Sequence, residues 1–312
     1  MVESIRWSQR SAPAFGFARA FASSFTEQAP IIATERIPVL NGLGPLRPTR
    51  AKSGDFPPIA RAYTRVSEVV RESGLLRRAP WFYAITALAV ALAFGGAVTG
   101  FVLLGDSWFQ LLIAAALGIV FTQIAFLAHE AAHRQILALG PANDRLARVL
   151  AGLIGMSYSW WDSKHSEHHS NPNRVGKDPD IEVDTISFIE EDAVLARGLR
   201  REITKRQGWF FFPLLTLEGL NLHFHSFKHL FGRGAVRGRW TELGIIAARF
   251  AVLVIPVFLV LPLGMAFAFM GVQLAVFGVY MGASFAPNHK GMPVIAHDAK
   301  LDFFTKQVRT SR

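Results

Sequence analysis

The pattern of apolar and polar positions divides the chain into long uncharged runs separated by polar segments. Three runs carry no charged residue, and the last of them, residues 250–287, contains the turn-like sequence LPLG at 261–264. A helix needs roughly 20 residues to cross the hydrocarbon of a bilayer. The runs therefore predict four transmembrane helices in two hairpins, at residues 81–104, 108–128, 244–263 and 265–286.

The segments outside these runs indicate a helical cap on one side of the membrane. Residues 1–58 are rich in Ser, Ala, Arg and Pro, which predicts a flexible cytoplasmic segment; an amphipathic or targeting segment is the alternative. Residues 59–77 have the apolar spacing of an interfacial helix, and residues 186–208 predict a cytoplasmic helix. Residues 209–231 are apolar but interrupted by Pro, Glu and His, which favours an interfacial or re-entrant helix pair. We therefore expect an all-α polytopic membrane protein with residues 59–312 as its folded domain.

The distribution of charge orients the predicted helices. The sequence has 33 Lys and Arg residues and a formal net charge of +10, but the short turns at 105–107 and 261–264 contain none of them. Cytoplasmic loops of membrane proteins carry an excess of Lys and Arg. We therefore expect an integral protein of the cell inner membrane with both termini and residues 130–243 in the cytoplasm, provided that Arg249 extends to the surface. This asymmetry explains the basic composition through membrane lipid, without a nucleic-acid partner.

Histidine is the residue type with the most informative spacing. Cysteine is absent, which excludes disulfides, thiolate metal sites and a cysteine nucleophile. The candidate metal ligands are His129, His133, His165, His168, His169 and His289. The first two are four positions apart, and the next three form an HxxHH sequence, so a helix places each set on one face. The predicted topology brings all six to one membrane surface, where neutral imidazoles suit Fe, Zn, Cu or Ni.

The sequence HEAAH at 129–133 also fits the HExxH motif of an intramembrane zinc protease, in which Glu130 is the general base. Such a site has three protein ligands, which leaves the HxxHH sequence unexplained. Five or six converging imidazoles favour a two-metal site, and a di-iron centre for oxygen chemistry fits them best. Glu130 then either orients a ligand histidine or is a polar residue at the membrane surface. A bis-histidine haem carrier is a third class, but its histidines are expected near mid-membrane.

These motifs and the two-hairpin topology resemble the integral-membrane fatty acid desaturase family. HEAAH at 129–133 and HSEHHSNPN at 165–173 have the forms of that family's first two histidine boxes, HxxxH and HxxHH. RESGLLRR, LEGLNLH and APNHKGMP are similar to its bacterial acyl-CoA or acyl-lipid branch. The likeness covers roughly residues 60–312, and it implies four membrane helices under a cytoplasmic cap that holds two irons.

The resemblance also implies site residues and a reaction. The implied ligands of a non-haem di-iron centre are His129, His133, His165, His168, His169 and His289, and Asn288 is expected to hold a metal-bound water. The implied reaction is O2-dependent formation of a cis double bond in a fatty acyl chain linked to CoA, to a carrier protein or to a lipid. A hydroxylase with the same centre is the closest alternative. Electrons are expected from a separate donor such as a ferredoxin and its reductase, because no fused cytochrome b5 domain is recognisable.

One motif of the family is not found in this sequence. A third box of the form H/Q-x-x-H-H is expected after the fourth span, but only His297 follows His289 before Arg312. We therefore expect a C-terminally incomplete domain whose metal cavity is open on one side. The three histidines within 223–229 are either substitute ligands or interfacial polar residues. The acids within 178–184 either orient ligands, contact an electron donor or lie in a solvated loop.

Overall fold

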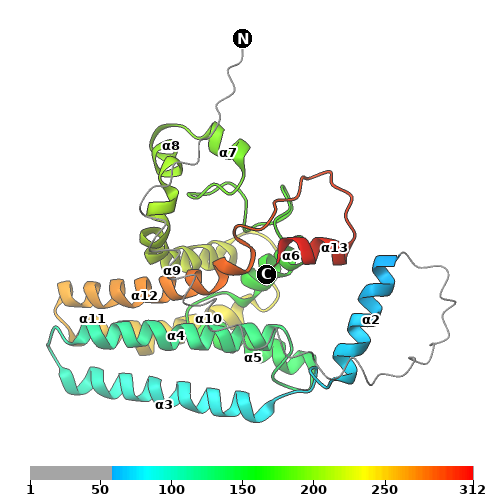
Figure 1. Cartoon of the computed structure of the whole chain (residues 1–312). Coiled ribbons are helices and arrows are strands. Elements are labelled where there is room, and N and C mark those ends of the chain that lie inside the picture. The colour runs from blue at the N-terminus through cyan, green and yellow to red at the C-terminus, as the bar shows by residue number, and fades with distance from the viewer. Residues whose placement is uncertain (1–57, 312) are drawn as a thin grey trace, which may run out of the picture. The chain divides into compact units, whose positions relative to one another are not determined.

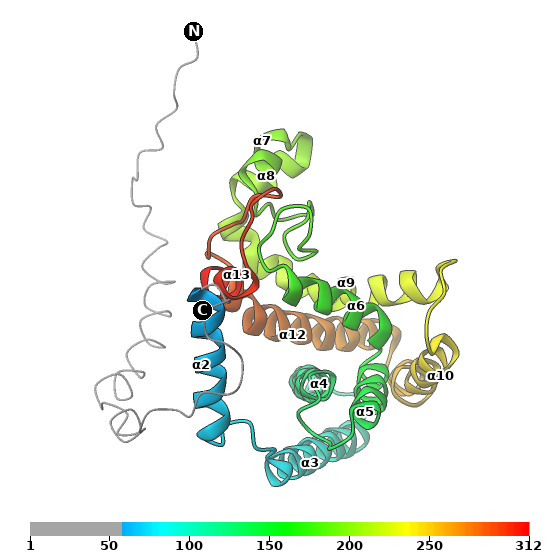
Figure 2. The same ribbon diagram turned by 90° about the vertical axis from the view of Figure 1, so that its right-hand side faces the viewer.

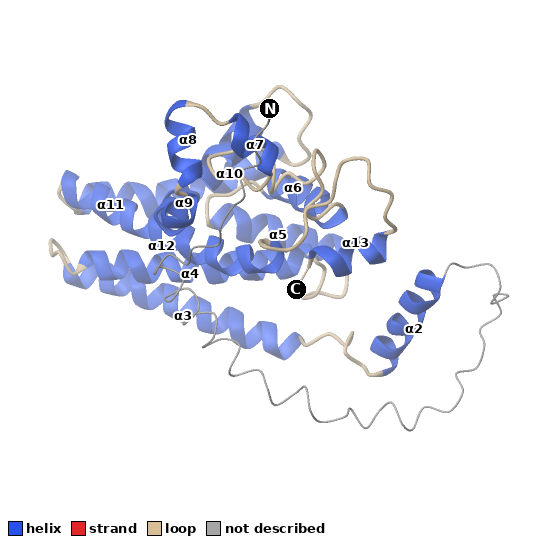
Figure 3. Cartoon of the chain, turned by 45° about the horizontal axis from the view of Figure 1, so that its top comes forward, coloured by secondary structure: helices blue, strands red, loops and turns tan. Residues whose placement is uncertain are grey.

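The described part of the chain, residues 58–311 of a computed structural model, consists of helices and loops (Figure 3). Within these residues, one isolated β-bridge joins Arg174 and Ile295. The all-α class predicted from the sequence is therefore confirmed. The flexible segment predicted for the N-terminus lies outside the described residues.

Four stretches of helix are long and apolar enough to cross a membrane. They are α3 (Pro80–Leu104), α4 (Gln110–Ala132), the α10–α11 stretch (Arg239–Val260) and α12 (Leu263–His289). Short turns join the first stretch to the second and the third to the fourth, as predicted. Helices α3, α4 and α12 run alongside one another (Figure 1), with α4 in contact with both of the others.

Helix α4 is the most buried of the four and lies between α3, α5 (Gly140–Leu153) and α12 (Figure 2). A Cβ atom at Gly118 of α4 would lie 2.8 Å from the carbonyl oxygen of Gln273 in α12. Glycine at this position therefore lets the two backbones approach closely, as small residues do between membrane helices. Helix α3 is exposed along most of its length, with Trp81 80% exposed, as expected for a lipid-facing helix.

The third span contains a change of helix type. It consists of α10 (Arg239–Arg249), the π-helical turn η2 (Phe250–Val254) and α11 (Ile255–Val260). Pro256 follows the π turn, and proline both lacks a backbone N–H and clashes with the carbonyl four residues earlier, so it disrupts regular α-helical bonding there. Arg249 is only 5% exposed, and its guanidinium carbon lies 5.4 Å from the centre of the Phe121 ring. The expectation that Arg249 extends to the surface is therefore wrong.

Helix α9 (Gln207–Phe231) is one continuous helix, which corrects the predicted helix pair. Pro213 lies in its second turn and removes one backbone hydrogen bond there. The helix continues because it packs closely along α12: a Cβ atom at Gly219 would lie 2.5 Å from the carbonyl oxygen of Leu274. This packing between distant segments cannot be recognised from local sequence.

Two short helices, α7 (Glu190–Leu195) and α8 (Gly198–Lys205), replace the single cytoplasmic helix predicted for this region. Ala196 and Arg197 between them have extended backbone conformations. Gly198 has a φ of +56°, a left-handed conformation that glycine adopts readily. The helical periodicity therefore ends at Leu195 and restarts in a new direction.

Three further helices complete the cap. Helix α2 (Pro58–Glu72) forms within the stretch predicted to be an interfacial helix. Helix α6 (Tyr158–Ser170) follows α5, and α13 (Phe303–Thr310) ends the described part of the chain. Tyr63 of α2 and Phe304 of α13 make an edge-to-face contact with 5.5 Å between ring centroids. This contact joins the first and last described helices.

Candidate metal centre

Helix α4 ends in the first pair of predicted ligands. His129 lies in its last turn and His133 follows as its C-terminal cap, with 4.5 Å between the two ring centroids. Arg134 then has a φ of +60°, which ends the helix immediately after the pair. The His129 ring also packs against Trp161 and Phe285, with centroid distances of 5.7 and 5.5 Å. One side of this histidine therefore faces aromatic carbon.

Helix α6 supplies the next three predicted ligands. Its first turn is capped by the Ser157 hydroxyl, which accepts a hydrogen bond from the Trp160 N–H. An α-helix turns about 100° per residue, so His165 and His169 lie on nearly the same side, whereas His168 points about 100° away from His169. The three residues share one face of α6, as predicted, but they divide between two groups of potential ligands because His168 lies at the edge of that face.

Four imidazoles form one group, which we call the histidine cluster: His129, His133, His165 and His169. Their potential ligand atoms all lie within 4.8 Å of one another. The Nε2 atoms of His133 and His165 are 3.0 Å apart. Two nitrogens that each lie about 2.1 Å from one ion, at right angles, are about 3.0 Å apart. The spacing therefore suits two ligands of a single metal ion.

His168 and His289 form a second group beside the histidine cluster. Their ring centroids are 4.6 Å apart, and the His168 ring lies 5.7 Å from that of His169. Nδ1 of His168 is 2.8 Å from Oδ1 of Asp178, and Nδ1 of His289 is 2.9 Å from the carbonyl oxygen of Thr310. All six predicted ligands therefore lie together, in two adjacent groups built from α4, α6 and α12.

The environment of α6 keeps two imidazoles of the cluster, His165 and His169, neutral. Burial, followed by the neighbouring His169 and His129, lowers the pKa of His165 to about 2. Burial, followed by His133 and His168, lowers the pKa of His169 to about 4. Metal binding requires the neutral form of imidazole. At neutral pH both side chains are therefore in the protonation state that a metal ion needs.

Glu130 lies beside the cluster and connects it to α3. Its Oε2 accepts a hydrogen bond of 3.0 Å from the Tyr83 hydroxyl, and its Oε1 is 3.4 Å from Nδ1 of His129. A carboxylate at the second ring nitrogen of a ligand histidine fixes the orientation of that ring. Of the two interpretations left open by the sequence, the contacts favour an orienting residue over a polar surface residue.

A small apolar cavity of about 30 Å³ lies beside His129. Its lining includes Ala125, Ala128, Ala151, Ile154, Met156 and Met281. This is room for about one water molecule, so a longer ligand needs side-chain movement to enter. The sequence analysis missed the cavity because α4, α5 and α12 meet there only in the folded protein. Its one sequence signal is the pair of small residues, Ala125 and Ala128, on one face of α4.

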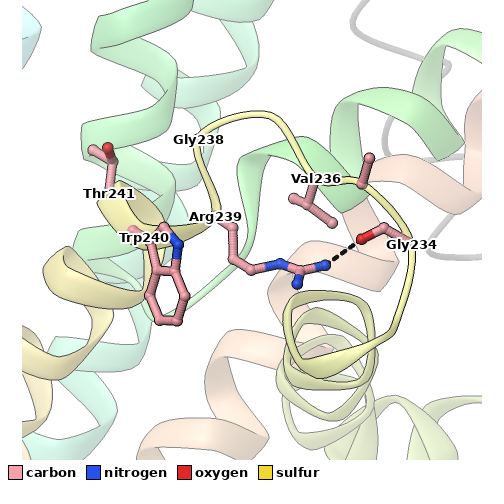
Figure 4. A pocket seen from close by; sticks show the side chains of 7 residues that line it. Gly234, Val236, Gly238, Arg239, Trp240 and Thr241 are labelled. Atoms are coloured by element: carbon pink, nitrogen blue, oxygen red, sulfur yellow. Dashed lines mark hydrogen bonds between the residues drawn. The ribbon is translucent and has the colours of Figure 1, made fainter.

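A larger hollow of about 390 Å³ lies in the loop 234–241, at the start of α10 (Figure 4). Arg239 donates hydrogen bonds there to the carbonyl oxygens of Gly232, at 2.8 Å, and of Gly234. Trp240 and Thr241 line the same hollow, which contains no histidine or carboxylate side chain. The chemistry-bearing residues therefore gather at the smaller cavity and not at this one.

The three histidines of α9 lie outside both groups. His223 is buried, and its ring nitrogens lie 2.6 and 2.9 Å from backbone carbonyl oxygens of its own helix and of Ile154. The interfacial position, one of the two alternatives given for this residue by its sequence, is therefore wrong for His223. The His225 ring stacks on Trp160 with 5.8 Å between centroids. Neither of these residues nor His229 belongs to a group of potential metal ligands within residues 58–311.

Comparison with known protein families identifies the class of this protein. The family profile described as "Fatty acid desaturase" matches residues 106–312. The chain therefore belongs to the membrane fatty acid desaturase family. The match argues against the intramembrane protease suggested by HEAAH at 129–133.

Named relatives are similar over part of their length. The chain is 25% identical over 195 residues to "Delta(8)-fatty-acid desaturase 2" of Arabidopsis thaliana, covering 58% of this chain and 43% of the relative. It is 27% identical over 197 residues to a "Delta 8-(E)-sphingolipid desaturase" of Kluyveromyces lactis, covering 58% and 33%. It is also 30% identical over 99 residues to "Fatty acid desaturase 2-like protein FADS2B" of Mus musculus, covering 31% and 20%. The chain thus spans less than half the length of these relatives.

Proposed function

We propose that this protein is an oxidoreductase that introduces a cis double bond into a fatty acyl chain at a non-haem di-iron centre. The observation that carries the proposal is the histidine cluster, four imidazoles whose potential ligand atoms lie within 4.8 Å of one another beside a second histidine pair. Residues 59–312 would form the desaturase domain. Its metal site and both termini would face the cytoplasm from the inner membrane.

The donor set fits two iron ions. Six imidazoles exceed the four ligands of one tetrahedral ion, and they divide into two adjacent groups. His129, His133, His165 and His169 would hold one ion, and His168 and His289 would contribute to the other. Imidazole is a good ligand for iron, and thiolate competition is absent because the chain has no cysteine. When bound, the iron pair would supply the reduction of O2 that makes removal of hydrogen from a methylene possible.

The overall reaction would consume O2, two electrons and two protons. Two C–H bonds on adjacent methylenes break, a carbon–carbon double bond forms, and O2 is reduced to two water molecules. The electrons would come from a separate donor such as a ferredoxin and its reductase. The acyl substrate would be linked to CoA, to a carrier protein or to a membrane lipid.

The protein's own residues would position the substrate and orient a ligand histidine. The cavity beside His129 is lined by alanine, isoleucine and methionine side chains, which suit a methylene chain. The rings of Trp161 and Phe285 pack on the same histidine and would shield part of it from water. Glu130, held by Tyr83, would keep the His129 ring in a fixed orientation.

The names of the relatives extend the range of substrates to be tested. Both fatty acid desaturases and sphingolipid desaturases are among them, and the Kluyveromyces lactis relatives are named for an (E) double bond. Lipid classes should therefore be analysed separately, and the geometry of the double bond should be determined. A hydroxy fatty acid as the main product would instead support the hydroxylase alternative.

The test is expression of the complete gene product in a host that lacks the activity, followed by mass spectrometry of its acyl chains. A new unsaturated acyl chain is expected with the unmodified protein. His133→Ala should abolish the product, whereas His229→Ala, a histidine outside both groups, should retain it. Product formation by His133→Ala at the unmodified rate would overturn the proposal.

A further inference from the structure

Two carboxylates lie close to one nitrogen of His168. Asp178 and Asp180 are 2.8 and 3.4 Å from its Nδ1, and the three residues together form a group of potential metal ligands. Two roles are chemically distinct. The carboxylates either bind a metal ion themselves, or they hold the imidazole so that its other nitrogen binds one.

The hydrogen bonds of Asp178 favour the second role. Its carboxylate is fully buried, and Oδ1 accepts from His168 Nδ1 and, at 2.9 Å, from the Asp180 N–H. Oδ2 accepts from the Asn173 N–H at 2.6 Å. These three donors occupy most of the roughly four lone-pair positions of a carboxylate. A metal ion on Asp178 would therefore have to displace donors that the fold already provides.

Asp180 makes its main contacts with two lysines. Its Oδ1 forms a 2.6 Å ion pair with Lys164, and its backbone carbonyl accepts a hydrogen bond from Lys290. The side chain is about one-third exposed, in contrast to the fully buried Asp178. Of the two acids, Asp178 therefore has the shorter and better enclosed contact with His168.

The contact with Asp178 determines which nitrogen of His168 is free. A neutral imidazole has one N–H and one lone pair. Donation from Nδ1 to the Asp178 carboxylate leaves the lone pair on Nε2, and the negative charge makes the imidazole a stronger ligand. His289 has the same arrangement, because its Nδ1 lies against the Thr310 carbonyl oxygen. Both rings of the second group therefore present Nε2 as the metal-binding atom.

Asn173 connects Asp178 to the backbone of His289. Its N–H donates to Asp178, and its side-chain Nδ2 donates to the carbonyl oxygen of His289 at 2.9 Å. Its φ of +53° is a left-handed conformation that asparagine adopts more readily than most residues. The loop after α6 thereby links the support of His168 to the end of α12, which carries His289.

We infer that Asp178 is a positioning residue and not a metal ligand. It holds His168 in the tautomer whose Nε2, together with Nε2 of His289, forms the second metal-binding position of the centre. The inference rests on the proposed function for the existence of two metal positions. It adds how the second position is supported: the Asp178 carboxylate fixes the ring of His168, and the Thr310 carbonyl oxygen fixes that of His289.

Asp178→Asn in the complete protein tests this inference. An amide has one acceptor oxygen and no charge, so either His168 or the Asn173 N–H loses its acceptor. In both orientations His168 loses the negative charge that makes it a stronger ligand. Titration of the purified metal-free protein with Co2+ should give about two bound ions for the unmodified protein. Loss of such a supporting partner weakens metal binding about 10–100-fold. We expect that decrease for one ion of Asp178→Asn, with unchanged affinity and absorption spectrum for the other.

Two matched variants separate the alternatives. Asp180→Asn should keep both ions if the inference holds, but should lose the same ion as Asp178→Asn if both carboxylates are ligands. Glu182→Gln changes an exposed carboxylate of the same loop and should bind both ions normally. Unchanged binding of the other ion by Asp178→Asn would also show that this variant is folded.

Three results would overturn the inference. Tight binding of both ions by Asp178→Asn would show that His168 needs no support from Asp178. Equal loss of one ion in Asp178→Asn and Asp180→Asn would identify both aspartates as metal ligands. A global loss of both ions, with the same weakening for each, would identify a general structural role. If the unmodified protein binds no second ion, the proposed di-metal function fails and this inference fails with it.

Discussion

The Nε2 atoms of His133 and His165 lie 3.0 Å apart, although 32 positions separate the two residues in the chain. One residue ends α4 and the other lies on α6, so α5 and its flanking turns must return the chain to the same point. Two imidazoles with their nitrogens at this distance are arranged to bind one ion together. This relationship is the geometric basis of the proposed metal centre.

Lower pH should destabilise the metal-free protein. The pKa values of His165 and His169, about 2 and about 4, lie below the ordinary value of 6.5. Between pH 6.5 and about 4, the unfolded chain therefore binds more protons than the folded chain, and the free energy of unfolding decreases as the pH falls. Chelator-treated protein should melt at a lower temperature near pH 5 than near pH 7.5. His165→Gln should show a smaller decrease, and an equal decrease in both proteins would contradict this explanation.

Glu242 should be essential for stability at the entrance of the third span. Its carboxylate is fully buried, 3.0 Å from Nε of Arg148, and it accepts hydrogen bonds from Ser157 and Ser159. Glu242→Ala leaves the Arg148 charge without its partner, and such changes cost about 3–5 kcal/mol at buried sites. A clearly lower melting temperature in detergent is expected. Glu191→Gln changes an exposed acid of α7 and should melt like the unmodified protein.

The apolar spans could be predicted because their signal is local and long. Residues 81–104 carry the signal without any reference to the rest of the chain. The continuity of α9 could not be predicted, because Pro213 and the histidines are residue types that typically interrupt an apolar helix. The contact of Gly219 with the backbone of α12 stabilises α9 as one helix. This contact joins segments that are distant in sequence, so local sequence does not reveal it.

The ligand residues of the candidate site could be predicted from the sequence, but their hydrogen-bond partners could not. The spacing of HEAAH and HxxHH identified five of the six histidines that gather in the structure, and the position of His289 at the end of the fourth span identified the sixth. It did not identify the partner of each ring, because Asp178 and Thr310 reach the histidines through loop and terminal geometry. It also did not reveal that His168 and His165 belong to different groups of potential metal ligands, because the grouping depends on the residues that pack against each side of α6.

Filling the cavity beside His129 should stop product formation without removing metal. Ala128 lines the cavity, which has a volume of about 30 Å³, and leucine in its place would occupy most of that space. We expect Ala128→Leu to retain its metal ions but to lose most of its desaturated product. Ala91→Leu on the exposed face of α3 is the matched control and should remain active. Loss of metal together with activity in Ala128→Leu would indicate misfolding and not blocked substrate access.

The metal centre and the first hairpin turn should lie on opposite sides of the membrane. The chain contains no cysteine, so a single introduced cysteine is its one thiol for labelling. Ser170→Cys, at the end of α6, should react only when the cytoplasmic side is accessible. Asp106→Cys, in the turn between α3 and α4, should react from the outside of intact cells. Labelling of both positions from the same side would contradict the proposed orientation.

The most direct test of the central claim is the metal content of the complete protein, purified from cells grown with iron and zinc. Elemental analysis should find about two iron ions and little zinc per chain, as expected for two groups of imidazole ligands. His165→Ala should lower the iron content, because it removes a ligand from the histidine cluster, and His229→Ala should not. About one zinc ion per chain, without iron, would contradict the proposed di-iron centre. That result would instead support the intramembrane zinc protease suggested by HEAAH at 129–133.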